Sequence, residues 1–251
     1  MHSVRSWPYQ GLLFCLGWLF CLSLQAAPLR IGVSFSIPPY VLQEENRGIE
    51  LDILRATLPD VQIVYLPLAR TWQGLSTGEL DGTINVHPGL IPGVYYSARV
   101  LTFHNRFFTQ AAQIPSGSLH ALSDLAGLKV AAFQYAHRIL GEEYAANVAS
   151  IPGYTETPKQ ILQVRQLVMG RVDAIVMEQR VFEYYLNQVR QEQPANAAPL
   201  PALAMHDLLP PTIYHFAFRD PAVRDSFDQQ LTRLRATGQF AAILARYGVS
   251  E

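Results

Sequence analysis

Short apolar runs alternate with segments of helical spacing along the first half of the chain. The apolar or alternating runs, which predict strands, are residues 29–35, 61–66 and 81–86. Apolar side chains at helical spacing follow the first two runs, at residues 49–57 and 71–77. Strands that alternate with helices predict a parallel, doubly wound α/β sheet.

The same alternation begins again near residue 120. Residues 122–127 lead into a strand predicted over 128–133, and a long helix is predicted from 136 to about 148. Further along, the pattern predicts helices at 158–169 and 178–189, a buried strand at 172–177, a loop at 193–201, a strand at 213–218, and two closing helices within 221–247 that break at Gly238. The chain therefore predicts a second α/β unit.

An uninterrupted apolar run of 14 residues, from Gly11 to Leu24, stands near the start of the chain. Arg5 precedes it and the small residues Ala26 and Ala27 follow it, which is the layout of a secretory signal peptide. The run is shorter than the roughly 20 residues that a helix needs to span a bilayer, so a permanent membrane anchor is the less favoured alternative. We expect residues 1–26 to be a signal peptide cleaved after Ala26, and the remaining chain to be exported.

Composition narrows the class of protein. Both cysteines, Cys15 and Cys21, lie in the expected signal peptide, so the exported chain can hold no disulfide. The chain is 49 % apolar and long enough to bury a core without cross-links. Its formal net charge is −1 with no basic block, which argues against a nucleic-acid partner.

No local pattern predicts a metal site, a cofactor or a catalytic group. The seven histidines show neither His-x-x-x-His nor Glu-x-x-His spacing. The chain contains no Gly-x-Ser-x-Gly elbow, no P-loop and no dinucleotide fingerprint. We therefore expect no metal, no cofactor and no catalytic residue.

Five fragments carry a resemblance to a known family. In chain order they are LRIGVSFSIPPYV, GELDGTINV, SDLAGLKVAAFQ, GRVDAIVME and DPAVRDSFDQQLTRLRATGQFAAILARYG. In this order and at this spacing they resemble the periplasmic solute-binding proteins of bacterial family 3, the polar amino acid uptake type. The resemblance covers nearly the whole chain after the expected signal peptide.

The resemblance implies the periplasmic-binding-protein type II fold, in which two doubly wound α/β lobes are joined by two hinge strands. Lobe 1 would take residues 27–109 and the returning segment 213–251, and lobe 2 would take residues 110–212. The chain is expected to cross between lobes near 106–113 and near 209–216. A solute would bind between the lobes, because ligands of open α/β sheets lie beyond the carboxyl ends of strands.

In the first lobe the resemblance points to four ligand-binding residues. Tyr40 matches an aromatic residue that packs on the ligand, with a surface turn as the alternative, and Ser34 falls where many relatives carry an acid. Asn85 and His87 fall on the loop where relatives hold the ligand carboxylate, and only Asn85 is chemically equivalent to the groups used there.

The largest departure from the family is a missing arginine. Amino acid binders place an arginine, with its fixed fork of donors for the α-carboxylate, where this sequence has Gly93. Arg70 and Arg138 are the candidate substitutes. For each of them, an exposed surface arginine is the alternative interpretation.

In the second lobe the family's Gly-Ser/Thr-Thr turn is replaced by Tyr135, Ala136 and His137, so its hydroxyls are lost. The resemblance makes Phe133 an apolar wall and His137 a hydrogen-bond donor to the solute, with a capping or exposed histidine as the alternative. Glu178 matches the acid that receives the ligand ammonium group. The alternative for Glu178 is a helix-starting glutamate, because acids favour the first helical turn.

The predicted function is a periplasmic, monomeric receptor that captures a small polar solute, amino acid-like or cationic, and presents it to an ABC permease. One alternative is a ligand-sensing partner of a membrane receptor. Another is an enzyme, because some relatives on this scaffold are periplasmic cyclohexadienyl dehydratases in which a cleft carboxyl acts as a general acid. Their substrates carry carboxylates, so the missing arginine argues against that alternative as well.

Overall fold

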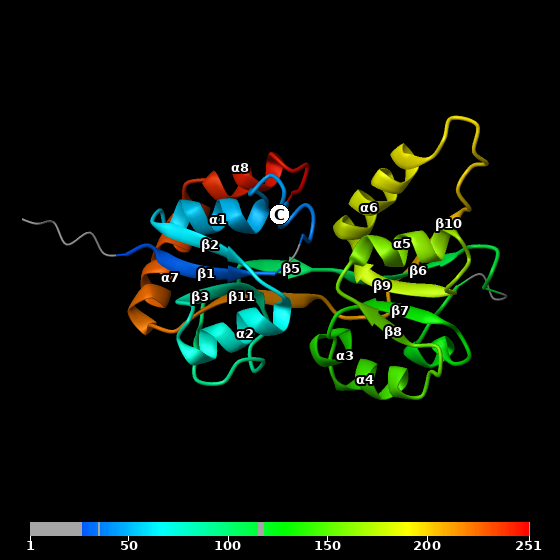
Figure 1. The fold of residues 1–251 in the computed structure, drawn as a ribbon, viewed down its shortest axis with the longest axis horizontal. Coiled ribbons are helices and arrows are strands. Elements are labelled where there is room, and N and C mark those ends of the chain that lie inside the picture. Colours follow the sequence, from blue (N-terminus) through cyan, green and yellow to red (C-terminus); the bar gives the residue numbers. More distant parts are fainter. Residues whose placement is uncertain (1–26, 35, 115–117, 251) are drawn as a thin grey trace, which may run out of the picture.

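Two α/β lobes lie side by side in the computed structural model, which describes residues 27–34, 36–114 and 118–250 (Figure 1). The expected signal peptide, residues 1–26, lies outside the described residues. In the part of the chain that the structure describes, no helix has the length and apolar character needed to cross a membrane.

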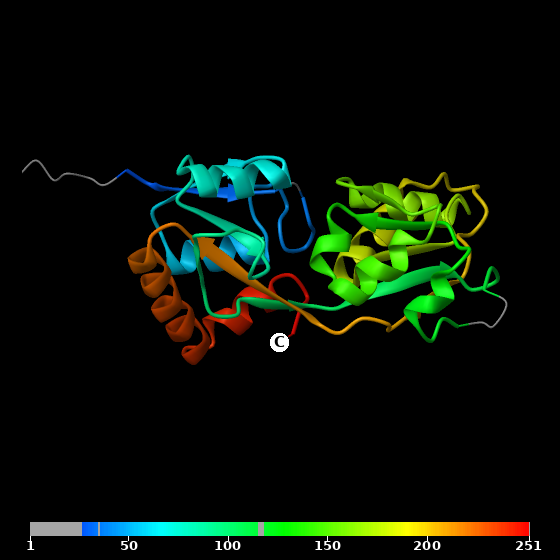
Figure 2. The same cartoon turned by 90° about the horizontal axis from the view of Figure 1, so that it is seen from below.

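Lobe 1 is built on a six-stranded sheet in the order β2-β1-β3-β11-β4, with β5 also paired to β11. Its strands are β1 (Leu29–Val33), β2 (Val61–Tyr65), β3 (Gly82–Val86), β4 (Tyr95–Tyr96), β5 (Leu101–Phe103) and β11 (Thr212–Phe218). Its helices are α1 (Ile49–Thr57), α2 (Leu68–Thr77), α7 (Pro221–Ala236) and α8 (Gln239–Ala245). Helices α1, α7 and α8 pack together on one face of the sheet, and α2 covers the other (Figure 2).

Lobe 2 is built on a five-stranded sheet in the order β10-β6-β9-β7-β8. Its strands are β6 (Asn105–Gln110), β7 (Val130–Phe133), β8 (Thr155–Thr157), β9 (Ala174–Glu178) and β10 (Leu203–His206). Its helices are the short 3-10 turn η1 (Leu122–Leu125), α3 (Ala136–Ile139), α4 (Glu142–Ala149), α5 (Gln160–Val168) and α6 (Gln179–Glu192). Strand β7 runs parallel to β8 and β9, whereas β6 runs antiparallel to both of its neighbours, β9 and β10.

The predicted fold class is confirmed, with one correction to each sheet. Both sheets are mixed, because β11 in lobe 1 and β6 in lobe 2 pair antiparallel with their neighbours. The single helix predicted from 136 to about 148 is wrong. It is two helices, α3 and α4, because Gly141 adopts a left-handed φ of 95° that ends the first helical turn.

Two short segments carry the chain between the sheets. Strand β5 ends at Phe103 and β6 begins at Asn105, so the outward crossing lies at His104. The return crossing occupies 207–211, between β10 and β11. The expected lobe boundaries at 109/110 and 212/213 thus fall inside β6 and β11. Asn105 Nδ2 donates to Thr212 Oγ1 at 3.1 Å, which ties the two crossings together.

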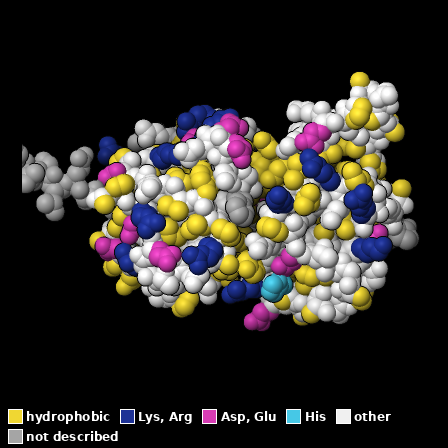
Figure 3. Space-filling view, in the orientation of Figure 1, with side chains coloured by type: hydrophobic (Ala, Val, Ile, Leu, Met, Phe, Trp, Pro, Cys, Tyr) yellow, Lys and Arg dark blue, Asp and Glu magenta, His cyan; other side chains and the backbone are white. Residues whose placement is uncertain are grey.

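The surface carries no block of one charge on the face in Figure 3, where Lys and Arg side chains are interspersed with Asp and Glu over both lobes. This distribution agrees with the formal net charge of −1. A basic face of the kind that binds a nucleic-acid backbone is not present there.

Candidate functional site

A cleft lies between the two lobes, beside the crossing segments. Strand ends and helix starts of both lobes form its walls. The described residues that line it are Ser34, Ser36, Ile37, Leu68, Trp72, Asn85, Phe103, Asn105, Phe133, Gln134, Ile139, Pro158, Gln160, Glu178 and Tyr214. Because ligands of open α/β sheets bind at such strand ends, this cleft is the candidate site.

Four of the predicted ligand-binding residues line this cleft, namely Ser34, Asn85, Phe133 and Glu178. Each lies at or next to the carboxyl end of a strand, respectively β1, β3, β7 and β9. These residues lie together because β1 runs parallel to β3 and β7 runs parallel to β9. Each parallel pair brings two carboxyl ends to the same edge of its sheet.

Tyr40 lies behind the cleft and not in its lining. Its side chain is 1 % exposed, which excludes a surface turn. The centroid of its ring lies 4.2 Å from that of Phe103, which does line the cleft. Arg180 Nη1 donates to the Tyr40 hydroxyl at 3.3 Å. Tyr40 therefore supports the wall that Phe103 presents.

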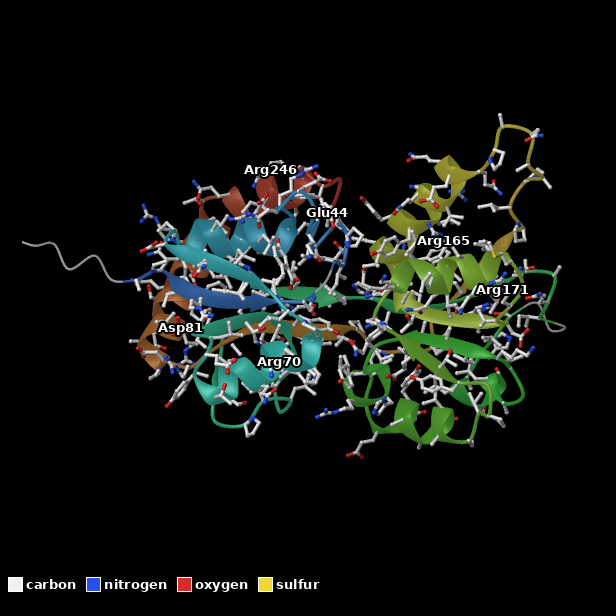
Figure 4. The ribbon with its side chains drawn as sticks, in the orientation of Figure 1. Glu44, Arg70, Asp81, Arg165, Arg171 and Arg246 are labelled. Atoms are coloured by element: carbon white, nitrogen blue, oxygen red, sulfur yellow. The ribbon has the colours of Figure 1, made fainter. Side chains whose placement is uncertain are left out.

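Arg70 and His87 make local contacts on lobe 1 and do not line the cleft. Arg70 is exposed on α2, where its Nη1 donates to Gln73 Oε1 at 3.0 Å (Figure 4). Helix geometry explains this, because Leu68 and Trp72 share the cleft face of α2 and Arg70 lies midway between them, half a turn away. His87 Nδ1 lies 2.9 Å from the carbonyl oxygen of the next residue, Pro88.

His137 and Arg138 belong to α3 and are both exposed. His137 Nδ1 lies 2.8 Å from Glu156 Oε1, a contact within lobe 2. The guanidinium carbon of Arg138 lies 5.4 Å from the centre of the Trp72 ring and 5.9 Å from that of the Tyr135 ring. Arg138 therefore stacks on an aromatic residue of the opposite lobe but is not a lining residue.

Glu178 combines a capping role with a place in the cleft. Its Oε2 accepts hydrogen bonds from the N–H groups of Arg180 at 2.8 Å and Val181 at 3.0 Å, which caps α6. Its Oε1 is buried and accepts no hydrogen bond of good geometry within the described residues, although the Tyr40 hydroxyl is near enough to act on the carboxyl. Burial raises the pKa of Glu178, against the lowering effect of the Val181 N–H and the Arg180 charge.

The sequence analysis missed a second buried carboxyl, Glu50, in the first turn of α1. It is 0 % exposed, and Asn85 Nδ2 donates to its Oε2 at 3.1 Å. Burial raises the pKa of Glu50 to about 8, against the lowering effect of that hydrogen bond. Because one N–H of the Asn85 side-chain amide donates to Glu50, the Asn85 side-chain oxygen is the group that can accept hydrogen bonds from other partners.

A signal for Glu50 was available in the sequence. Positions 50, 53, 54 and 57 share one face of a helix, and Ile53 and Leu54 are apolar. An acid on an apolar helical face is either buried with partners or functional. Spacing alone does not show that Asn85, from a strand 35 residues away, is the partner.

Aromatic side chains that the sequence analysis also missed supply much of the remaining lining. Phe103 and Tyr214 pack with their ring centroids 4.5 Å apart. Trp72 packs on Tyr135 of lobe 2 at a centroid distance of 5.2 Å, and its buried Nε1 has no hydrogen-bond partner among the described residues. Trp72 thus joins the two lobes beside the cleft.

The residues assembled here are not those of a metal centre. Among the described residues, no group of three or more His, Cys, Asp or Glu side chains is placed to hold a metal ion. The polar groups that reach the cleft are carboxyl, amide, hydroxyl and indole groups. They suit hydrogen bonding to an organic solute.

Comparison with known proteins gives matches among solved structures only. No protein-family model matches the chain, and no curated protein does. A histidine kinase sensor domain with similarity to periplasmic binding proteins matches with a TM-score of 0.73 at 20 % identity, over 89 % of this chain and 98 % of that one. The GluR0 ligand-binding core in complex with L-glutamate matches with a TM-score of 0.71 at 18 % identity, over 89 % and 99 % of the two chains.

A third similar structure is the amino acid ABC transporter substrate-binding protein AbpA from Streptococcus pneumoniae, bound to L-arginine. Its TM-score is 0.67 at 17 % identity, over 88 % of this chain and 94 % of that one. At such identities the likeness establishes the fold alone. The chain therefore has the periplasmic-binding-protein type II fold.

Proposed function

We propose that this chain binds a small polar solute, amino acid-like or cationic, in the cleft between its lobes. The observation that carries the proposal is the buried Glu178, whose Oε1 lacks a well-formed hydrogen bond and which lines the cleft with Asn85 and Trp72. A buried carboxyl without a full set of partners is costly, and a ligand with an N–H donor would satisfy it. Closure of the lobes would remove the Glu178 carboxyl and the ligand's N–H donor from water.

We propose further that the protein is exported and serves uptake through an ABC permease. The signal-peptide layout of residues 1–26 supports export. A role as the sensing partner of a membrane receptor is the alternative. The similar structures include a kinase sensor domain and a receptor core as well as a transporter's binding protein, so the shared fold favours neither role.

We propose a binding protein without catalytic turnover. The cleft carboxyl of Glu178 already caps α6 through Oε2, and Glu50, the acid whose pKa is raised to about 8, lies behind Asn85 and outside the lining. A general acid must reach the group that it protonates. A dehydratase assay with prephenate-like acids checks this: product formation would contradict it.

The first experiment is a thermal-shift screen of a protein that begins at Ala27, refolded to remove co-purified ligand. The panel contains amino acids, amines and carboxylates. A ligand at 100 times its Kd adds about 2.7 kcal/mol of stability, which moves the Tm of a chain this long by several degrees. If no compound of the panel raises the Tm, the proposal is contradicted.

A matched pair of variants ties any hit to the cleft. Gln160→Lys places a long cation on a lining residue at the start of α5 and should abolish the shift. Gln166→Lys adds the same charge to the same helix away from the lining and should preserve it. Loss of the shift in both variants, or in neither, would show that the ligand binds elsewhere.

A further inference from the structure

An internal carboxylate already occupies the main-chain donors at the second-lobe turn. Glu156 Oε2 accepts from the Tyr135 N–H at 2.7 Å, and its Oε1 accepts from the His137 N–H at 3.0 Å and from the Tyr154 hydroxyl at 2.6 Å. Burial raises the pKa of Glu156, but these hydrogen bonds outweigh it and hold the pKa below its usual range. The carboxylate is therefore a stable, charged occupant of the turn.

No fully charged donor belongs to the described lining of the cleft, and the nearby Arg138 stacks on the Trp72 ring. None of the described lining residues is Lys, Arg or His. Gly93, where the resemblance leads one to expect an arginine, provides no side chain. The donors of the described lining are neutral: the Trp72 indole, side-chain amides and hydroxyls, and the starts of α2 and α5, which bring Leu68 and Gln160 to the cleft. Neutral donors suit a hydroxyl or carbonyl group better than a carboxylate held beside Glu178.

Features that favour a cation are present in the same cleft. Glu178 contributes a buried carboxyl, and the aromatic residues Trp72, Phe103, Phe133 and Tyr214 line the walls around it. Aromatic faces attract ammonium and guanidinium groups, more strongly when water is excluded.

The side chain of Arg180, two residues beyond Glu178, directs its hydrogen bonds to groups other than this carboxyl. Arg180 donates to the Tyr40 hydroxyl at 3.3 Å and to the Ser250 carbonyl at 3.4 Å. Within the described part of the chain, Arg180 makes no direct ion pair with Glu178, although its charge acts to lower the pKa of that carboxyl. The Oε1 atom of Glu178 can therefore accept a hydrogen bond from a positively charged ligand group.

We infer that the ligand of this cleft is an organic cation without a carboxylate, an alkylamine or alkylguanidine whose charged group binds Glu178 and whose chain packs on the aromatic walls. This inference rests on the proposed function and narrows its solute class. A free amino acid would bring a carboxylate for which the cleft has no charged partner, because Glu156 fills the turn and the arginine is missing.

Isothermal titration calorimetry with two matched pairs of probes tests the inference on the protein that begins at Ala27. Agmatine is compared with L-arginine, and cadaverine with L-lysine, so that the members of each pair differ by one carboxylate. We expect each amine to bind at least about tenfold more tightly than its amino acid, a factor that corresponds to about 1.4 kcal/mol. Glu178→Gln should remove most of the affinity for the amine.

A variant on the same helix serves as control. Glu183→Gln changes an exposed carboxyl of α6 that accepts from Gln179 Nε2, and it should leave the affinity for the amine unchanged. Equal or tighter binding of the amino acids would overturn the inference and leave the proposed function standing. Absence of binding by both amines would also overturn it, and the proposed function would then be judged by the amino acids and carboxylates of the wider screen.

Discussion

The two oxygens of Glu178 have different partners, which separates its structural role from its proposed binding role. Oε2 caps α6, and Oε1 is the oxygen left for a ligand. A glutamine at this position retains one carbonyl oxygen for the cap and loses the charge. An alanine loses both the capping oxygen and the negative charge.

We predict that Glu178→Ala lowers the free energy of unfolding by about 1 kcal/mol or more, because two N–H groups of α6 lose their acceptor. Glu178→Gln should cost clearly less. Urea unfolding of the ligand-free protein measures both. Asp220→Ala removes the cap of α7, which accepts from the Ala222 N–H alone; it is the control and should also cost about 1 kcal/mol. Equal losses in Glu178→Gln and Glu178→Ala would contradict the division of roles.

The buried carboxyl of Glu50 should make stability depend on pH. In the folded protein burial raises its pKa to about 8, from an ordinary value of 4.5, so the folded state binds more protons between these values. The free energy of unfolding should therefore fall as pH rises from 5 to 8, and level off above that range. We predict a smaller fall in Glu50→Gln, measured by urea unfolding at several pH values.

A difference between variants isolates Glu50 from other titrating groups. His206, whose pKa burial lowers, and Glu178 contribute alike to the wild type and to Glu50→Gln. Glu142→Gln removes an exposed carboxyl at the start of α4 and is the matched control. Parallel stability curves for the wild type and Glu50→Gln would contradict the prediction.

At the scale of single residues, strand ends were predictable from the sequence and side-chain directions were not. Ser34, Asn85 and Glu178 were predicted from the resemblance, and the structure places each of them at or next to a strand end in the cleft lining. Arg70 is not a lining residue because α2 begins at Leu68, three residues before its predicted start, and that shift fixes which face of the helix meets the cleft.

The turn that leads into α1 depends on a glycine. Gly48 has a φ of 138°, and a Cβ at this position would lie 2.3 Å from the carbonyl oxygen of Tyr40. The Glu50 N–H donates to the same oxygen at 3.0 Å. The close approach of these two segments places Glu50 behind Asn85.

We predict that Gly48→Ala lowers the free energy of unfolding by about 2–4 kcal/mol, since the added methyl group meets backbone atoms that cannot rotate away. Gly127→Ala is the control, because Gly127 also has a left-handed φ of 81° but has nothing within 4 Å of the added methyl group. It should cost roughly 1–2 kcal/mol, the conformational term alone. Denaturant unfolding measures both, and equal losses would show that the contact with Tyr40 adds nothing.

At the scale of elements, periodicity predicted the order of strands and helices better than their limits. The break between α3 and α4 was missed because Gly141 interrupts a run whose apolar spacing continues on both sides. The outward crossing lies at His104, just before the expected range 106–113. The polar residues 104–106 do not by themselves distinguish a crossing from an ordinary loop, and only the pairing of β5 with β11 and of β6 with β9 assigns the two strands to different sheets.

At the scale of the whole molecule, the two lobes meet through aromatic and polar contacts beside the cleft. Trp72 of α2 packs on Tyr135, and the Tyr185 hydroxyl donates to the Ser36 carbonyl at 3.3 Å. The order of motifs predicted two lobes around a cleft. The contacts across the cleft depend on the relative position of the lobes, which periodicity does not encode.

Trp72 makes the relative position of the lobes measurable. It is the single tryptophan after residue 26, since the other two, Trp7 and Trp18, lie in the expected signal peptide. The intrinsic tryptophan fluorescence of a protein that begins at Ala27 therefore reports on one site, where Trp72 lines the cleft and packs on the opposite lobe. We predict that a ligand which raises the Tm also shifts this emission, saturating with the Kd measured by calorimetry.

Two variants test whether the emission follows contact between the lobes. Tyr135→Ala removes the ring on which Trp72 packs while leaving Trp72 in place, so the ligand-free emission should move toward that of a more hydrated indole. Asn147→Ala, on α4 of the same lobe and outside the lining, is the control and should leave the emission unchanged. If calorimetry detects binding while the Trp72 emission stays the same with and without ligand, the ligand does not alter the environment of Trp72. In that case the proposed placement of the ligand between the lobes is wrong.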